Sequence, residues 1–126
     1  VILLGVQMVH ADRIKVPADS FRMGCSAGDP ACEADEGPPG GVPVSVPTFL
    51  MDTHEVTVAE YRACVSAGNC TEPLTNARNQ YCNYGHAERD RHPVNCLDWD
   101  QAAAYCAAAG GRQPAQPDWE RAARAG

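Results

Sequence analysis

The segment HPVNCLDWDQAAAYCAAAGG, residues 92–111, passes from an irregular apolar stretch into a helix within a few residues. Residues 92–99 predict a short strand that leads directly into that helix. Asp98 stands at the N-cap position with Gln101 three residues later, and these residue types cap a helix start reciprocally. Alanine favours the helix as far as Gly110, a residue type that commonly ends helices. A strand that runs straight into a helix, without regular βαβ alternation elsewhere, predicts an α+β fold.

One face of this predicted helix carries Trp99, Ala102, Cys106 and Ala109. Helical spacing places the four side chains on one stripe, so we expect this stripe to be buried. The alanines on it are small, which allows a neighbouring segment to pack closely.

The segment HEVTVAEYRACVSAGNC, residues 54–70, predicts a second helix. Thr57 followed by Glu60 forms a capping-box pattern, which predicts a helix from about residue 58 to 67 that stops at Gly68. Its expected buried stripe consists of Val58, Tyr61, Val65 and Cys64.

Strands are expected before this helix. Residues 14–24 read as a strand, a turn and a second strand, and residues 42–52 read as a strand whose prolines place it at a sheet edge.

Composition restricts the partners of the chain. Its 126 residues suit one domain, and its formal net charge is −6. Nucleic acid and anionic membrane surfaces attract basic proteins, so the charge excludes both as expected partners. No stretch is long enough to predict a membrane span.

Seven cysteines in a chain of this length indicate an oxidising compartment, and we expect a secreted or periplasmic protein. The odd number leaves at least one thiol without a partner in the chain. We interpret residues 1–11 as the remnant of a signal peptide, because Val9 and Ala11 occupy positions −3 and −1 of a cleavage site before Asp12. The alternative is that this apolar run forms a buried first strand.

Residues 25–43 have the composition of a loop and carry three acidic residues, Glu33, Asp35 and Glu36. The three carboxylates could bind calcium, but their spacing differs from that of an EF-hand loop, and we favour a solvated loop.

Five motifs in register resemble the sulfatase-modifying factor family, the formylglycine-generating enzyme domain. They are a Phe-x-Met-Gly segment, a Glu-Val-Thr segment followed by Tyr, a Pro-Val segment followed by Trp, an Ala-x-x-Tyr-Cys segment, and an Arg-x-Pro loop before Trp-Glu-x-Ala-Ala-Arg. The resemblance covers about residues 18–126. The matching positions are Phe21, Met23 and Gly24; Glu55, Val56, Thr57 and Tyr61; Pro93, Val94 and Trp99; Ala102, Tyr105 and Cys106; and Arg112, Pro114, Trp119, Glu120, Ala122, Ala123 and Arg124.

The resemblance implies a C-type-lectin-like α+β fold with two or three helices and much irregular structure. It also implies that residues 12–126 are the first part of one domain. The family's copper-binding cysteine pair, its calcium and much of its substrate groove lie in the second half. The resemblance therefore implies no catalytic residue and no metal or cofactor in this chain; copper and calcium would belong to a full-length parent. The structural motif residues are Glu55, Thr57, Pro93, Trp99, Arg112, Trp119, Glu120 and Arg124.

We predict three disulfides, Cys25–Cys32, Cys64–Cys70 and Cys82–Cys96. A zinc site formed by Cys82, His86, His92 and Cys96 is the alternative for the third pair. Cys106 remains, either as a buried core thiol or, as the resemblance implies for some members, as the partner of a cysteine in the second half.

The last loop departs from the family pattern. Gln113 replaces a usual leucine, which predicts the loss of a core contact. Ala115 replaces the usual threonine N-cap, at an expected cost of about 1 kcal/mol, which Pro117 and Asp118 partly offset.

Two functions follow from the resemblance. In the first, the parent oxidises a cysteine of a client sulfatase to formylglycine, and this chain alone is not catalytic. In the second, the parent is a non-catalytic extracytoplasmic module that binds another protein or peptide. In either case we expect the rest of the domain, or another chain, to cover the C-terminal helix.

Overall fold

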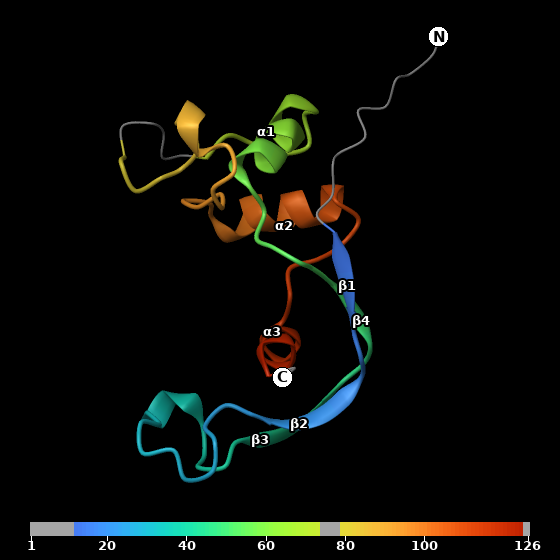
Figure 1. The fold of residues 1–126 in the computed structure, drawn as a ribbon, viewed down its shortest axis with the longest axis vertical. Coiled ribbons are helices and arrows are strands. Elements are labelled where there is room, and N and C mark those ends of the chain that lie inside the picture. Colours follow the sequence, from blue (N-terminus) through green and yellow to red (C-terminus); the bar gives the residue numbers. More distant parts are fainter. Residues whose placement is uncertain (1–11, 74–78, 125–126) are drawn as a thin grey trace. The chain divides into compact units, whose positions relative to one another are not determined.

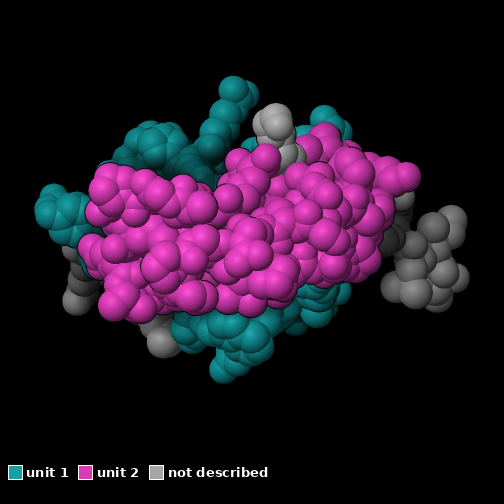
Figure 2. Space-filling view, turned by 90° about the horizontal axis from the view of Figure 1, so that it is seen from below, with its two compact units in different colours: residues 1–12, 52–113 teal, residues 13–51, 114–126 magenta. Residues whose placement is uncertain are grey.

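A computed structural model describes residues 12–73 and 79–124 of the chain. The proposed signal remnant, residues 1–11, lies outside the described residues. The described chain divides into two compact units, coloured separately in Figure 2. One consists of Asp52–Gln113 together with Asp12, and the other of Arg13–Met51 and residues 114–124.

The second unit is built on two pairs of short strands (Figure 1). Strand β1 (Arg13–Val16) pairs with β4 (Phe49–Asp52), and β2 (Asp19–Met23) pairs antiparallel with β3 (Val42–Val46). The expected single strand over residues 42–52 is therefore two strands, interrupted at Pro47, which has no N–H to donate to a ladder. Between the pairs, the Ala18 N–H donates instead to Thr48 Oγ1 at 3.0 Å.

Helix α3 (Gln116–Ala123) completes this unit by packing against β2 and β3. Its N-cap is Ala115, as the sequence predicts, and no side chain there accepts a hydrogen bond. Asp118 accepts the Ala115 N–H at 3.0 Å and is buried. The loop between β2 and β3 contains the short 3₁₀ helix η1 (Ala34–Glu36).

The first unit packs two helices around tyrosines and a disulfide. Helix α1 (Val58–Ser66) buries Tyr61 and Cys64, and helix α2 (Trp99–Ala108) contributes Tyr105. The rings of Tyr61 and Tyr105 stack with centroids 5.8 Å apart. Tyr84 meets Tyr61 edge-on at 6.1 Å, an arrangement that aromatic pairs favour.

Both helix starts have the caps that the sequence predicts. Thr57 Oγ1 accepts the Glu60 N–H, and Glu60 accepts the Thr57 N–H at 2.8 Å. Asp98 accepts the Gln101 N–H at 2.8 Å, and Gln101 accepts the Asp98 N–H at 3.1 Å. Each pair satisfies backbone donors that a helix start otherwise leaves without partners.

The strand expected over residues 92–99 does not form. Pro93 makes only an isolated bridge with Thr57, and the Val94 N–H donates to Val56 O at 2.8 Å. Cys96 then adopts a φ of 60°, a left-handed conformation through which a strand cannot continue. Upstream of this segment lies the 3₁₀ helix η2 (Ala87–Arg89).

The expected buried face of α2 is also wrong. Gln101 and Tyr105 are the buried residues of this helix, whereas Trp99 is 73% exposed and Cys106 is half-buried. The reason is that Gln101 has partners inside: its Nε2 donates to Thr71 Oγ1 at 3.1 Å and to Glu72 O at 2.9 Å. Because the Gln101 amide finds its hydrogen-bond partners in the interior, the helix buries the face of Gln101 and Tyr105 and not the purely apolar stripe.

None of the helices in the described residues is long and apolar enough to cross a bilayer.

Replacing Thr57 by alanine tests the cap of α1. We expect Thr57→Ala to lower the free energy of unfolding by about 1 kcal/mol in urea denaturation, because the Glu60 N–H loses its acceptor. Thr57→Ser keeps the hydroxyl and is expected to remain close to the unmodified chain. Equal losses in both variants would show that the methyl group, and not the cap, carries the effect.

Candidate functional site

Six of the seven cysteines of the chain are joined in disulfides. The structure joins Cys25 to Cys32, Cys64 to Cys70 and Cys82 to Cys96, with Cα–Cα distances of 5.6, 5.3 and 5.6 Å. These are the pairs that the sequence predicts. Each closes a short loop, which contributes on the order of 2–3 kcal/mol of stability.

The zinc alternative needs two thiolates that the structure joins in the Cys82–Cys96 disulfide. Of the two histidines, His86 faces a carboxylate, with its Nδ1 3.7 Å from Glu88 Oε1. Within residues 12–73 and 79–124, no group of three or more histidine, cysteine, aspartate or glutamate side chains is arranged to hold a metal ion.

The acidic loop uses its carboxylates on its own backbone. Glu36 accepts the Glu33 N–H at 2.9 Å, and Asp29 accepts the Ala31 N–H at 2.9 Å. Glu33, Asp35 and Glu36 are exposed, in keeping with the solvated loop expected from the sequence.

The single thiol, Cys106, lies half-buried on α2. Burial, and then the nearby Asp52 carboxylate, raise the pKa of this thiol above its ordinary value. The thiolate is the nucleophilic and metal-binding form, so the surroundings of Cys106 make it less reactive than a free cysteine.

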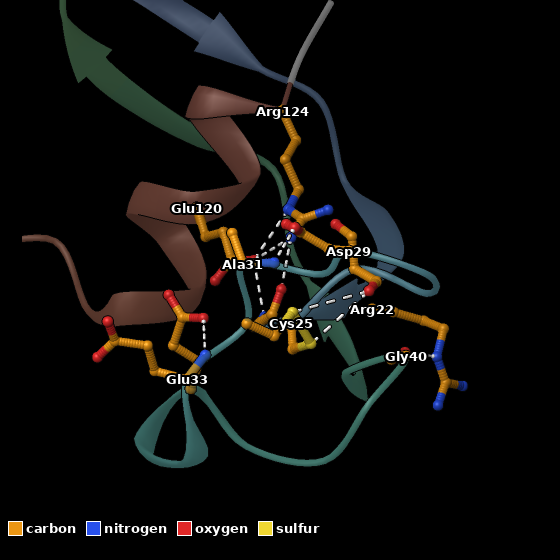
Figure 3. Close-up of a disulfide and its surroundings, with 12 residues drawn as sticks. Arg22, Cys25, Asp29, Ala31, Glu33, Gly40, Glu120 and Arg124 are labelled. Carbon is orange, nitrogen blue, oxygen red and sulfur yellow. Dashed lines mark hydrogen bonds and ion pairs between the residues drawn. A yellow bond between two sulfur atoms is a disulfide. The ribbon is translucent and has the colours of Figure 1, made fainter.

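The contacts that join distant motifs meet at Gly24, the residue after strand β2. Glu120 Oε1 accepts the Gly24 N–H at 2.8 Å, and Arg124 Nη2 donates to the Gly24 carbonyl at 2.8 Å. The two side chains are themselves an ion pair, with Arg124 Nη2 2.7 Å from Glu120 Oε1. We call this arrangement the Gly24 clamp. Figure 3 shows Glu120 and Arg124 extending from α3 toward the chain beside Cys25.

The backbone at Gly24 admits no larger residue. Its φ is +90°, and a Cβ at this position would lie 2.5 Å from the Glu36 carbonyl oxygen. The adjacent Cys25 N–H donates to that same carbonyl at 3.4 Å. The glycine of the Phe-x-Met-Gly motif is therefore required both by conformation and by space.

Two further contacts hold the unit of strands and α3. Arg22 donates from Nε to the Gly40 carbonyl and from Nη2 to the Gly41 carbonyl, the latter at 2.7 Å. Arg121, on α3, lies 3.5 Å from Asp19 Oδ2 at the start of β2.

The remaining motif residues act locally or face solvent. Glu55 is exposed, and its carbonyl interacts with His54 Nδ1 at 2.8 Å. Arg112 donates to the Gln113 carbonyl at 3.0 Å. Trp119 is 62% exposed.

The expected loss of a contact at Gln113 is offset by a hydrogen bond. Its Nε2 donates to the Trp99 carbonyl at 3.1 Å, in place of the apolar contact of a leucine.

Sequence reasoning did not identify the inward role of Gln101 or the Gly24 clamp. Gln101 is the third residue of the helix, and this position predicts its role in the cap. It does not predict the hydrogen bonds of its side chain to residues 71–72. For the clamp no local signal existed, because its residues are 96 and 100 positions apart.

The sequence model described as the Sulfatase-modifying factor enzyme 1-like domain matches residues 6–126. The chain belongs to this family. Membership carries the C-type-lectin-like fold, in agreement with the short antiparallel strands, three helices and irregular segments described above.

Individual relatives agree with this assignment. The chain is 28% identical to the formylglycine-generating enzyme of Bos taurus over 90% of its own length and 39% of that protein. It is 25% identical to the formylglycine-generating enzyme of Thermomonospora curvata over 95% of its own length and 51% of that protein. The chain thus spans about two-fifths to one half of the length of these curated relatives.

Alanine substitutions at Gly24 and Gly28 distinguish the cost of a left-handed backbone conformation from the cost of a steric clash at the new Cβ. Gly28 has a φ of +79° but open space around it, so Gly28→Ala is expected to cost about 1–2 kcal/mol of unfolding free energy, from conformation alone. Gly24→Ala should cost more, because the new Cβ also meets the Glu36 carbonyl. Chemical denaturation of both variants measures the difference, and equal losses would contradict the crowding at Gly24.

The raised pKa of Cys106 has a direct chemical consequence. We expect alkylation of the native chain by iodoacetamide to begin at higher pH than that of the same thiol in the denatured, unreduced chain, because burial holds the folded thiol protonated. Rates measured from neutral to alkaline pH in the two states make the comparison. A folded-state rate that rises at the same pH as the denatured one, or earlier, would contradict the burial effect.

Proposed function

We propose that this chain is the structural N-terminal part of an extracytoplasmic formylglycine-generating-enzyme-like protein. In this proposal the chain builds and stabilises the scaffold, and the oxidation chemistry resides elsewhere in the parent. The support is that the motif residues hold backbone: Thr57 caps α1, and Glu120 with Arg124 fixes Gly24.

The observation that carries the proposal is the state of the cysteines. The family's oxidation, as the resemblance implies, requires two thiolates together on copper, a soft ion that thiolates bind well. Six of the seven cysteines are joined in disulfides, and Cys106 is a single half-buried thiol whose pKa is raised. The residues of this chain therefore do not fit copper, and we assign it no catalytic step.

For the parent we propose oxidation of a client cysteine, in a sulfatase, to formylglycine. The support is the family assignment together with relatives that carry the name formylglycine-generating enzyme. Those relatives extend well beyond the matched region, which leaves room in a parent of similar length for a catalytic cysteine pair and for calcium.

A non-catalytic module that binds a protein or peptide is the second candidate. It is favoured by the number of cysteines that serve structure alone, since three disulfides in so short a chain suit a stabilised extracellular module. A cysteine pair in the second half of the parent is the feature that separates the two candidates.

A secreted or periplasmic location is part of the proposal. The three disulfides are consistent with an oxidising compartment, because such bonds persist there and are rare where thiols are kept reduced.

Turnover of a sulfatase-motif peptide tests whether the scaffold and the oxidation chemistry reside in different parts of the parent. We expect the 126-residue chain with copper and oxygen to leave the peptide cysteine unchanged, and the full-length parent under the same conditions to convert it to formylglycine, as read by mass spectrometry of the peptide. Cys106→Ala in the parent serves as the control and should retain the activity. Conversion by the short chain would overturn the scaffold assignment, and no conversion by the parent would favour the binding module.

A further inference from the structure

Three hydrogen bonds meet at the backbone of Gly24 and Cys25. The Gly24 N–H donates to Glu120 Oε1 at 2.8 Å, and the Gly24 carbonyl accepts from Arg124 Nη2 at 2.8 Å. The Cys25 N–H, in the same peptide group as that carbonyl, donates to the Glu36 carbonyl at 3.4 Å. The Gly24 clamp therefore holds a peptide group whose second residue, Cys25, is part of a disulfide.

The disulfide confines the loop that brings Glu36 to this peptide group. It joins Cys25 to Cys32, so residues 33–35 are the only chain between the crosslink and Glu36. Without the crosslink, the connection from Cys25 to Glu36 would run freely through residues 26–35. A longer free connection costs more conformational entropy to close, so the Glu36 carbonyl would be held less firmly beside the peptide group.

Cys32 is the approachable sulfur of this disulfide. It is half-buried, and residues 26–31 and 33–39 on either side of it are all exposed. Cys25, in contrast, is only 5% exposed. A thiol reagent therefore reaches the disulfide from the side of Cys32, through the surface of the loop.

The other two disulfides are more enclosed. Cys64 and Cys82 are completely buried, and Cys70, the partner of Cys64, is 8% exposed. Cys96 is half-buried, but the residue after it, Leu97, packs against the core of α1 and α2. Since exposed disulfides are the more easily reduced ones, we expect the disulfide in the loop between β2 and β3 to open first.

We propose that this disulfide is a redox latch for helix α3. When closed, it holds the loop where the clamp forms, and α3 stays packed against β2 and β3. When a dithiol reductant opens it, the loop is released, the clamp loses its fixed backbone partner, and α3 separates from the two strands. Helices α1 and α2 keep the other two disulfides and stay folded. The latch makes the stability of the strand unit respond to the thiol–disulfide balance of the compartment.

The opening step is thiol–disulfide exchange. One thiolate of the reductant bonds to Cys32 Sγ, the bond between the two cysteine sulfurs breaks, and Cys25 leaves as a thiolate that takes a proton from solvent. The second thiol of the reductant, once deprotonated, attacks the reductant sulfur that is bound to Cys32, and Cys32 leaves as a thiolate and is protonated. Two electrons pass to the protein, and the reductant departs as its own disulfide.

Hydrogen exchange of the native chain at controlled dithiol concentration tests the latch. Peptide mapping by mass spectrometry finds the concentration at which Cys25–Cys32 is open and the other two disulfides are closed. There we expect the amides of α3 to exchange at least about tenfold faster than in the oxidised chain, because a released helix opens locally, and those of α1 to keep their rates. Unchanged exchange in α3 would overturn the proposal, as would earlier or simultaneous opening of another disulfide.

The coupling also has to act in reverse, since a clamp that the disulfide supports must support the disulfide equally. In buffers of a dithiol and its disulfide, we expect Glu120→Gln to lower the dithiol-to-disulfide ratio that half-reduces Cys25–Cys32 by about fivefold. The control Asp90→Asn removes the ion pair with Arg62, 2.7 Å long in the helical unit, and is expected to leave this ratio unchanged. No shift in Glu120→Gln, or the same shift in both variants, would overturn the latch.

Discussion

Glu120 and Arg124 form an ion pair, and together they bind both backbone polar groups of Gly24, its N–H and its carbonyl. The carboxylate accepts the N–H in a part-buried position and the guanidinium donates to the carbonyl nearer the surface, so one ion pair satisfies two backbone groups. Hydrogen bonds to charged groups are stronger than those between neutral ones. This contact fixes helix α3 against the end of β2, and the Cys25–Cys32 disulfide begins at the next residue. The strand unit depends on this contact, because its two chain segments are separated by residues 52–113 and are linked covalently by the backbone alone.

In the helical unit, satisfied polar groups have the same role. Tyr61 is fully buried, and its hydroxyl donates to the Thr71 carbonyl at 2.9 Å. Gln101 binds the same short segment from α2. Because the Cys64–Cys70 disulfide precedes Thr71, the segment is held by one covalent bond and by hydrogen bonds from two helices. This core contains few large apolar side chains. Its arrangement is fixed by buried hydrogen bonds and by a disulfide in addition to apolar packing.

The features that sequence could predict are local ones. The caps at Thr57 and Asp98 follow from residue types three positions apart, and the Cys64–Cys70 pairing follows from a helix end and the turn after it. The direction in which α2 faces could not be predicted, because apolar spacing pointed to Trp99 and Cys106 whereas hydrogen bonding turned Gln101 inward. The strand expected at residues 92–99 failed because Cys96 adopts a left-handed conformation that no sequence pattern marked. The clamp needed the fold itself, since its residues come from opposite ends of the chain.

The proposed function depends on one claim, that six of the seven cysteines of this chain serve structure and that Cys106 is left as a single thiol. Peptide mapping of the non-reduced, alkylated protein by mass spectrometry tests it most directly. The account predicts crosslinked peptides containing Cys25–Cys32, Cys64–Cys70 and Cys82–Cys96, with the alkyl group on Cys106. A disulfide that includes Cys106, or a pair among the other six recovered as free thiols in the native protein, would contradict it.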